Sequence, residues 1–287
     1  MRTIKGKRVL ITGAAAGIGR ALALAIAEQD APLVLVDIDE AGLDSLAAEL
    51  GSKVAVQTYV CDLSQPLKIS QLVRNVLRGG PIDVLINNAG VAYYGPTENM
   101  TQQQWDWLLA INLNAPIQLT HELLPSMLER PEPHIVNMCS ISGVVAGGRF
   151  AAYHVSKFGL IGFTEALRAE FGRRGMGVSA ICPGPVRTDL YKNGLSGRIG
   201  QAVPEPPKLM TATPEKIAAR TVNAIRRNKR MTLITPTAHL LYHLKRFTPG
   251  LIDFANQFSR KKFRRRRAAK KLVVEQVQEY EQASKAA

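Results

Sequence analysis

Short runs of apolar residues alternate with longer amphipathic stretches through the first 235 residues of the chain. Apolar runs without strict polar alternation are typical of strands buried on both faces of a sheet, and helical periodicity marks the stretches between them. We predict strands at 9–11, 33–36, 54–60, 84–86, 134–138, 178–181 and 231–234, and helices from the glycines at 17–19 to about 28 and at about 40–50, 66–78, 102–128, 153–173 and 214–227. Strands that alternate with helices imply right-handed crossovers, and hence a parallel sheet covered by helices on both faces.

Prolines and glycines affect one of these helices and one segment outside them. Pro116 and Pro125 fall inside the long helix predicted at 102–128, which can accommodate them only with a kink or a break. Residues 190–210 hold several Gly and Pro and have no clear periodicity, so we predict a mobile loop with short helical pieces there.

The composition is that of a folded protein kept inside the cell. The 287 residues are 46% hydrophobic and 21% charged, enough to bury a large core. The N-terminus has no apolar signal segment, and no apolar run reaches the roughly 18 residues of a membrane span. The cysteines, Cys61, Cys139 and Cys182, are too few and too widely spaced for a disulfide framework or a metal site. We therefore expect a cytoplasmic protein without a metal.

The C-terminal part of the chain differs from the rest in its charge. The formal net charge is +14, and the segment from Lys245 to the end carries 12 Lys or Arg against 4 Asp or Glu. Apolar residues at helical spacing in 240–258 precede a basic run at 261–271, a pattern that suits peripheral contact with an anionic membrane. A packed extra helix or a subunit interface explains the same pattern equally well. Nucleic-acid binding is disfavoured because no aromatic stacking platform accompanies the basic run. We predict one domain at 1–235 and a helical, polybasic extension at 236–287.

A glycine-rich turn follows the first predicted strand and opens the first helix. Gly13, Gly17 and Gly19 would let the backbone approach a phosphate at the helix N-terminus, where N–H donors and the helix dipole favour an anion. Asp37 ends the second strand, where a carboxylate can bind a ribose diol and repel a 2′-phosphate. No basic residue lies inside the turn or directly after Asp37, so we predict NAD rather than NADP.

Tyr153 and Lys157 are four residues apart in a predicted helix and therefore lie on one face of it. A phenol has a reference pKa of about 10, and a neighbouring ammonium favours its ionised form, which brings proton transfer within reach of neutral pH. Such a pair also occurs on ordinary amphipathic helices, so the pair alone does not establish catalysis.

The motifs taken together resemble the ordered signature of the short-chain dehydrogenase/reductase family. The resemblance covers about residues 6–235 and rests on Thr12-Gly13-x-x-x-Gly17-Ile18-Gly19, Asn87-Asn88-Ala89-Gly90, Asn112, Ser140, Tyr153-x-x-x-Lys157 and Pro183-Gly184. It implies a three-layer Rossmann fold with a doubly wound, seven-stranded parallel sheet. It also implies hydride transfer between a primary or secondary alcohol, or its aldehyde or ketone, and a nicotinamide.

The resemblance assigns four catalytic residues. Tyr153 would be the general acid/base, Lys157 would favour its phenolate and hold the nicotinamide ribose, and Ser140 would polarise the substrate oxygen. Asn112, in the long helix, would support a water-mediated proton relay to Lys157. Cys139 stands where many relatives have a first serine; we expect it to pack, with Ser142 as a candidate helper.

The resemblance also assigns a cofactor site. Asp62, with Leu63 beside it, would reach the adenine, and the backbone at Asn88 would follow the adenosine ribose. Thr188 would bind near the carboxamide. The predicted cofactor-binding residues are Gly13, Ala15, Ala16, Gly17, Ile18, Gly19, Asp37, Asp62, Leu63, Asn88, Ala89, Gly90, Tyr153, Lys157, Pro183, Gly184, Val186 and Thr188.

Substrate and partners are less determined by these residues. Apolar walls from Tyr93, Tyr94, Phe150 and Val144-Val145, with His154 and Arg149 as nearby polar groups, predict an apolar alcohol or ketone of steroid, retinoid or long-chain type. Relatives often pair through the long helices after the fourth and fifth strands, which predicts a homodimer or homotetramer. The alternative is a non-catalytic nucleotide-binding or scaffold protein that acts through its basic tail.

Overall fold

A parallel sheet of seven strands forms the centre of the first compact unit, Met1–Tyr242. The computed structural model describes residues 1–186, 195–196, 211–255 and 257. The strands lie in the order β3-β2-β1-β4-β6-β7-β9, and every neighbouring pair is parallel. Their bounds are β1 Val9–Thr12, β2 Leu33–Asp37, β3 Val56–Val60, β4 Val84–Asn87, β6 His134–Met138, β7 Gly177–Cys182 and β9 Met231–Leu233. The predicted fold class is confirmed.

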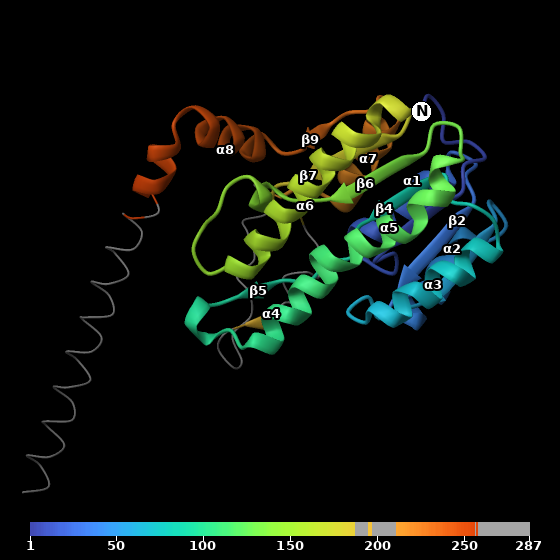
Figure 1. Ribbon diagram of the computed structural model, residues 1–287, viewed down its shortest axis with the longest axis horizontal. Helices are drawn as coiled ribbons and strands as arrows, with labels where there is room; N and C mark the ends of the chain where they lie inside the picture. The colour runs from blue at the N-terminus through green and yellow to red at the C-terminus, as the bar shows by residue number, and fades with distance from the viewer. Residues whose placement is uncertain (187–194, 197–210, 256, 258–287) are drawn as a thin grey trace, which may run out of the picture. The chain divides into compact units, whose positions relative to one another are not determined.

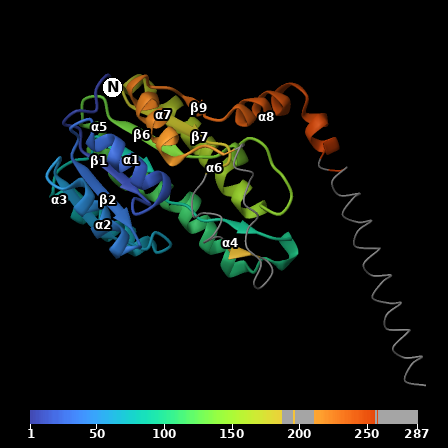
Figure 2. The ribbon, with the colours of Figure 1, turned by 180° about the vertical axis from the view of Figure 1, so that it is seen from behind.

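Helices cover both faces of this sheet, as Figures 1 and 2 show from opposite sides. One face packs against α1 (Gly17–Ala27), α2 (Glu40–Leu50) and α7 (Pro214–Arg226), and the other against α3 (Pro66–Arg78), α5 (Ala115–Leu128) and α6 (Ala151–Phe171). Successive strand residues point to opposite faces, so Ile11 is buried in one core and Leu10 in the other. The apolar strand runs are therefore explained by burial on two sides.

The strand order reverses at β1, and this reversal determines where a ligand can bind. From β1 the chain moves outward to β2 and β3, and then returns to β4 on the other side of β1. The connections that follow β1 and β4 leave in opposite directions, which opens a crevice at the carboxyl ends of these strands. The glycine-rich turn and Asn87–Gly90 both begin there.

The region predicted as one long helix at 102–128 consists of three segments, and the interruption expected at a proline occurs next to Pro116. An α-helix, α4 (Gln102–Leu109), begins at a capping box formed by Thr101 and Gln104, and a π-helical turn, η2 (Ala110–Asn114), separates it from α5. Pro116 has no N–H, so the carbonyl of Asn112 lacks its usual α-helical donor, and the chain widens there. Pro125, by contrast, lies within α5, which continues to Leu128.

A second, two-stranded sheet was absent from our prediction. Strand β5 (Tyr93–Tyr94) pairs in parallel with β8 (Leu195–Ser196). The remainder of the loop predicted at 190–210 lies outside the described residues. Strands of two residues have no periodicity that a sequence could reveal.

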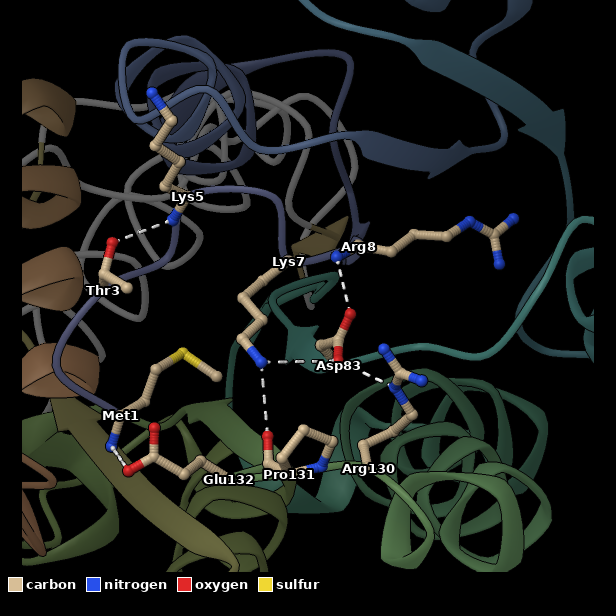
Figure 3. A network of polar contacts seen from close by, with 9 residues as sticks. All are labelled: Met1, Thr3, Lys5, Lys7, Arg8, Asp83, Arg130, Pro131 and Glu132. Carbon is tan, nitrogen blue, oxygen red and sulfur yellow. Dashed lines mark hydrogen bonds and ion pairs between the residues drawn. The ribbon is translucent and has the colours of Figure 1, made fainter.

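A buried carboxylate organises the amino ends of β1 and β4, opposite the crevice (Figure 3). Asp83 is 2% exposed and accepts hydrogen bonds from the Arg8 backbone N–H (2.9 Å) and the Arg130 Nε (2.9 Å), with Lys7 Nζ at 3.9 Å. A buried charge is tolerated when it is paired and hydrogen-bonded in this way. The end of the sheet opposite the crevice is thus fixed by ionic contacts.

His134 in β6 is buried in its neutral form. The Ser179 hydroxyl donates to the Lys229 carbonyl (2.6 Å), so His134 Nε2, 3.0 Å from Ser179 Oγ, must carry the ring proton. Nδ1 is buried with no hydrogen-bond partner in the described part of the chain. Burial lowers the pKa of His134 to about 3.

We expect this histidine to make the folded state sensitive to acid. The pKa of His134 falls from about 6.5 in the unfolded chain to about 3 in the folded protein. The contribution of the neutral ring to the free energy of unfolding is therefore fully present above pH 6.5 and is lost as the pH falls from there towards 3. Between pH 7.5 and 5 the loss due to His134 should be about 2 kcal/mol. His134→Gln keeps a donor for Ser179 but cannot be protonated. Urea unfolding at both pH values should therefore show a pH effect smaller by that amount in the variant, and equal effects in both proteins would contradict this account.

The C-terminal part beyond β9 begins with α8 (Pro236–Phe247), and residues from His243 onward form a second compact unit. In the described part of that unit, Phe247, Leu251 and Phe254 are exposed. The basic run at 261–271 lies outside the described residues. In the portion of the chain that the structure describes, none of the helices has the length and apolar character needed to cross a membrane.

Candidate active site

A cavity of about 590 Å³ lies at the carboxyl ends of the central strands. This is the size of a small-molecule site. It is lined by most of the predicted residues: Gly13, Ala16, Gly17, Ile18, Asp37, Asp62, Leu63, Asn88, Ala89, Gly90, Ser140, Tyr153, Lys157, Pro183, Gly184 and Val186. Ala15, Gly19 and Asn112 are not in the lining, and Thr188 lies outside the described residues. The tertiary structure thus gathers residues from positions 13 to 186 around one cavity.

The glycine-rich turn is held against the start of the β4 loop. Gly13 has φ +66°, and a Cβ there would lie 2.8 Å from the Ala89 Cα, so only glycine fits. The Asn88 side chain donates to the carbonyls of Thr12 (2.9 Å) and Gly13 (3.0 Å). A side chain at Gly19 would overlap the Gly13 carbonyl. Gly19 therefore shapes the turn, Gly13 and Gly17 line the cavity, and Asn88 does both.

The N-terminus of α1 is available to an anion. Ala16 precedes the helix in an extended conformation and offers no side-chain cap, so the first N–H groups of this 11-residue helix have no side-chain acceptor there. Both Ala16 and Gly17 line the cavity. Uncapped donors combined with the positive end of the helix dipole suit a pyrophosphate.

Asp37 lies where β2 ends, and its carboxylate is fixed by backbone donors. Oδ2 accepts from Ala15 N (2.9 Å), and Oδ1 accepts from the N–H groups of Ile38 (2.8 Å) and Asp39 (3.1 Å). Arg20, the basic residue just after the turn, is paired with Glu49 at 2.5 Å. Asp37 thus presents a negative charge to the cavity and also supports the turn through Ala15.

Asp62 is bound mainly by its own loop. Its carboxylate accepts from Ser64 N (2.9 Å), Ser64 Oγ (2.7 Å) and Gln65 Nε2 (2.6 Å). Burial acts to raise the pKa of Asp62, but these hydrogen bonds outweigh it, and the pKa is lowered. The carboxylate is therefore anionic and oriented where it lines the cavity.

Tyr153 and Lys157 share one face of α6, as their spacing predicts. Lys157 Nζ lies 5.7 Å from the centre of the Tyr153 ring and donates to the Met138 carbonyl at 2.9 Å. Lys157 is 4% exposed, and burial lowers its pKa, an effect that the neighbouring Cys139 and Cys182 thiols oppose. The Lys157 side chain is thus buried beside the phenol.

Asn112 is fully buried in the π-helical turn. Its side-chain amide accepts from Val91 N (2.8 Å) and donates to Val91 O (2.8 Å), and it lies 3.3 Å from Ser156 Oγ. Gly90 lies between this residue and Lys157: a Cβ built on Gly90 would be 3.4 Å from Asn112 Oδ1 and 3.7 Å from Lys157 Nζ. Asn112 therefore lies near Lys157, but its side chain binds the Val91 backbone.

Ser140 directly follows β6 and the buried Cys139, and it lines the cavity. Its Oγ accepts from the Ser142 N–H at 3.1 Å, which leaves the hydroxyl proton to be donated elsewhere. Ser142 thereby contributes its backbone, a contact that sequence reasoning did not identify.

The substrate side of the cavity is apolar and differs in part from the predicted walls. Phe150 lines it together with Val91, Ala92 and Ile141. Tyr93 is only 2% exposed and packs on Leu108, so it is a core residue, and Tyr94 packs behind Phe150 with their ring centres 4.9 Å apart. Neither tyrosine lines the cavity, nor do the Val144-Val145 pair, Arg149 and His154.

This architecture matches a known family over most of the chain. Residues 7–198 match the family described as short chain dehydrogenase. The chain belongs to this family. The predicted enzyme class is confirmed: the protein is a short-chain dehydrogenase, an NAD(P)-binding oxidoreductase that acts on CH–OH groups.

Individual relatives agree with this assignment. D-threitol dehydrogenase of Mycolicibacterium smegmatis is 38% identical over 222 residues, covering 76% of this chain and 85% of the relative. A short-chain dehydrogenase from Burkholderia phymatum solved with NAD has a TM-score of 0.77 at 26% identity, covering 88% of this chain and 96% of that one. One from Sphingobium yanoikuyae solved with NADPH has a TM-score of 0.71 at 29% identity, covering 79% and 87%.

Proposed function

We propose that Tyr153, Lys157, Ser140 and Asn112 catalyse hydride transfer between a secondary or primary alcohol, or the corresponding carbonyl, and a nicotinamide in the cavity described above. The observation that carries this proposal is the buried Lys157 ammonium 5.7 Å from the Tyr153 ring on the wall of the cavity. A cation in a site of low dielectric favours the phenolate by electrostatic attraction, and a phenolate can accept the alcohol proton.

Each residue has one task in the proposed reaction. Ser140 donates its hydroxyl proton to the substrate oxygen and fixes it near Tyr153, which removes the alcohol proton or returns it to the alkoxide. Lys157 stabilises the phenolate, and Asn112 holds Val91 so that the space beside Lys157 stays open for a proton relay. The nicotinamide, when bound, accepts or supplies the hydride.

The cavity suits a dinucleotide held by the predicted residues. The uncapped start of α1 takes the pyrophosphate, Asp37 the adenosine ribose, and Asp62 with Leu63 the adenine side. Val186 and Thr188 remain proposed contacts on the nicotinamide side.

We propose NAD as the preferred cofactor. Asp37 would lie beside a 2′-phosphate, and like charges in contact cost several kcal/mol. Arg20, the nearby cation, is already paired with Glu49.

The Asp37→Asn variant should relax this preference. It keeps an acceptor for the Ala15 N–H but removes the charge, so we expect the ratio of kcat/KM for NAD over NADP to fall at least about tenfold, equivalent to roughly 1.4 kcal/mol. Initial rates with both cofactors measure this ratio. Asp44→Asn, an exposed carboxylate on α2, is the control that should leave it unchanged. A wild-type enzyme that prefers NADP would contradict the proposal.

We propose that the substrate carries an apolar group next to its carbinol carbon. Phe150 and Ile141 on the cavity wall support an apolar neighbour, as in a steroid, retinoid or long-chain alcohol. The name of the Mycolicibacterium relative points instead to a polyol. A panel of long-chain secondary alcohols and D-threitol, followed at about 340 nm as is usual for reduced nicotinamide, separates the two classes. Faster turnover of the polyol would overturn the apolar assignment.

We propose that two copies of the chain pair through α5 and α6. Ile117 on α5 and Val155 and Phe158 on α6 are 36%, 50% and 42% exposed, which is unusual for large apolar side chains on helices that also face a core. A dimer or tetramer would cover them. Sedimentation velocity tests this, and a monomer at micromolar concentration would contradict it.

We propose that residues 1–235 hold both sites and that 236–287 is an extension that contacts anionic membranes. Phe247, Leu251 and Phe254 are exposed at helical spacing, and the basic run follows them in the sequence. The full-length protein should sediment with vesicles that contain phosphatidylserine and not with pure phosphatidylcholine. Equal partitioning would leave a packed helix or a subunit interface as the explanation.

A further inference from the structure

The side chain of His154, next to Tyr153 in α6, is held by two hydrogen bonds. Its Nδ1 lies 2.8 Å from the Ser142 carbonyl oxygen, and its Nε2 lies 2.9 Å from the Gly147 nitrogen. A carbonyl can only accept and a backbone N–H can only donate, so the ring is neutral with its proton on Nδ1. The residue is 9% exposed. With both nitrogens engaged, His154 has no group left to bind substrate.

These contacts connect the loop that carries Ser140 to α6, the helix that carries Tyr153. Ser142, whose carbonyl binds His154, donates its own N–H to Ser140 Oγ at 3.1 Å. A short path thus runs from Ser140 through Ser142 and His154 to the backbone beside Tyr153. The same bond occupies an acceptor site of the Ser140 hydroxyl and leaves its proton for the substrate.

The packing of the loop against α6 supports this connection. A Cβ on Gly143 would lie 2.5 Å from the Lys157 carbonyl and 2.7 Å from Ile161 Cδ1, so the loop lies directly against the helix. The second bond of His154 holds Gly147, three residues before Phe150 on the cavity wall. The two nitrogens therefore hold two different parts of the loop.

We propose that His154 is a positioning residue. Through Nδ1 it positions the Ser140 hydroxyl relative to Tyr153, and through Nε2 it holds the loop segment that leads to Phe150 on the cavity wall. The proposal rests on the proposed function, since it assumes that Ser140 and Tyr153 act on one substrate oxygen. Small displacements of a reacting group reduce turnover strongly, by up to about 100-fold for 1 Å.

Two conservative variants separate the two bonds. The amide of Asn reaches the position of Nδ1, and the amide of Gln reaches the position of Nε2. His154→Gln keeps an acceptor for Gly147 and loses the bond to Ser142, so kcat should fall about tenfold or more with little change in KM. His154→Asn keeps the bond to Ser142 and frees Gly147, so KM should rise several-fold while kcat stays within about threefold.

A double-mutant cycle with Ser140→Ala tests whether His154 acts through Ser140. The tenfold effect of His154→Gln should largely disappear when Ser140 is already alanine, because the group it positions is gone. His239→Gln is the control, since this exposed histidine on α8 also contacts a carbonyl, that of Leu233 at 3.1 Å, away from the cavity. NAD affinity should be unchanged in all variants, and the two His154 variants, each of which loses one hydrogen bond, should lower Tm by similar amounts.

Three results would overturn the proposal: unchanged kcat in His154→Gln, equal losses of kcat in the Asn and Gln variants, or a full tenfold effect in the Ser140→Ala background. The proposed function fails separately, if Tyr153→Phe and Ser140→Ala retain wild-type turnover. If His154→Gln does not fold, His154→Asn still tests the proposal. A fold decrease in kcat larger than the fold increase in KM in that variant would contradict it.

Discussion

Replacing Tyr153 with phenylalanine should reduce turnover by about 10³- to 10⁴-fold while the protein folds and binds NAD as before. The change removes only the phenolic oxygen, and positioned general acid/base groups contribute on the order of 10² to 10⁴ in rate. The ring remains for its packing against Phe150, whose centre is 6.3 Å away. Stopped-flow or steady-state reduction of NAD, together with a fluorescence titration of NAD, measures both quantities.

Tyr59→Phe is the matched control for this variant. Tyr59 lies in β3, outside the cavity lining, so the loss of its hydroxyl should leave turnover unchanged. Turnover within tenfold of wild type in Tyr153→Phe would show that another group transfers the proton, and the proposed mechanism would then be abandoned.

Replacing Lys157 with methionine should abolish most activity and at the same time stabilise the protein without cofactor. In the part of the chain that the structure describes, no carboxylate pairs with this 4% exposed ammonium. Replacement of buried charges by apolar groups of similar volume is often stabilising by about 1–4 kcal/mol. The lost bond to the Met138 carbonyl offsets part of this, so we expect a net gain of about 1 kcal/mol.

Activity should fall by at least about 10³-fold in the same variant, because the phenolate of Tyr153 loses its cation. Urea unfolding without cofactor measures the stability, and kcat/KM measures the activity. Lys216→Met, an exposed lysine on α7, should change neither. A variant that is both inactive and several kcal/mol less stable would mean that Lys157 is mainly a structural residue.

Much of the fold followed from local patterns. The helices at 40–50 and 66–78 and the strand at 134–138 were predicted with the bounds that the structure has. The helices bury one face against a core, and the strand is buried on both faces of the sheet. Burial of this kind places apolar residues at regular spacing or in continuous runs, and the sequence shows this pattern. The glycines were predicted because backbone approach to a phosphate restricts which residues can stand there, and Asp37 because a carboxylate at the end of the second strand can bind a ribose diol.

Features that depend on contacts distant in sequence were missed or misassigned. The π-helical turn arises where Pro116 removes a helical donor and Asn112 binds the Val91 backbone. Tyr93 was predicted as a substrate wall, but packing against Leu108 buries it. A hydrophobic side chain near a site can face either the cavity or the core, and the sequence does not distinguish the two.

The pair Tyr153 and Lys157 and the strand ends around them were determined by the sequence itself, because helical spacing and strand periodicity are properties of the local chain. The tertiary structure decided the environment of that pair. It alone made Lys157 a buried cation, used the amide of Asn112 to hold Val91, and turned His154 from a candidate substrate contact into a link between the Ser140 loop and α6. Burial and hydrogen-bond partners are set by residues in other segments of the chain, 7 to 21 positions away in these cases, and no helical or strand periodicity contains them.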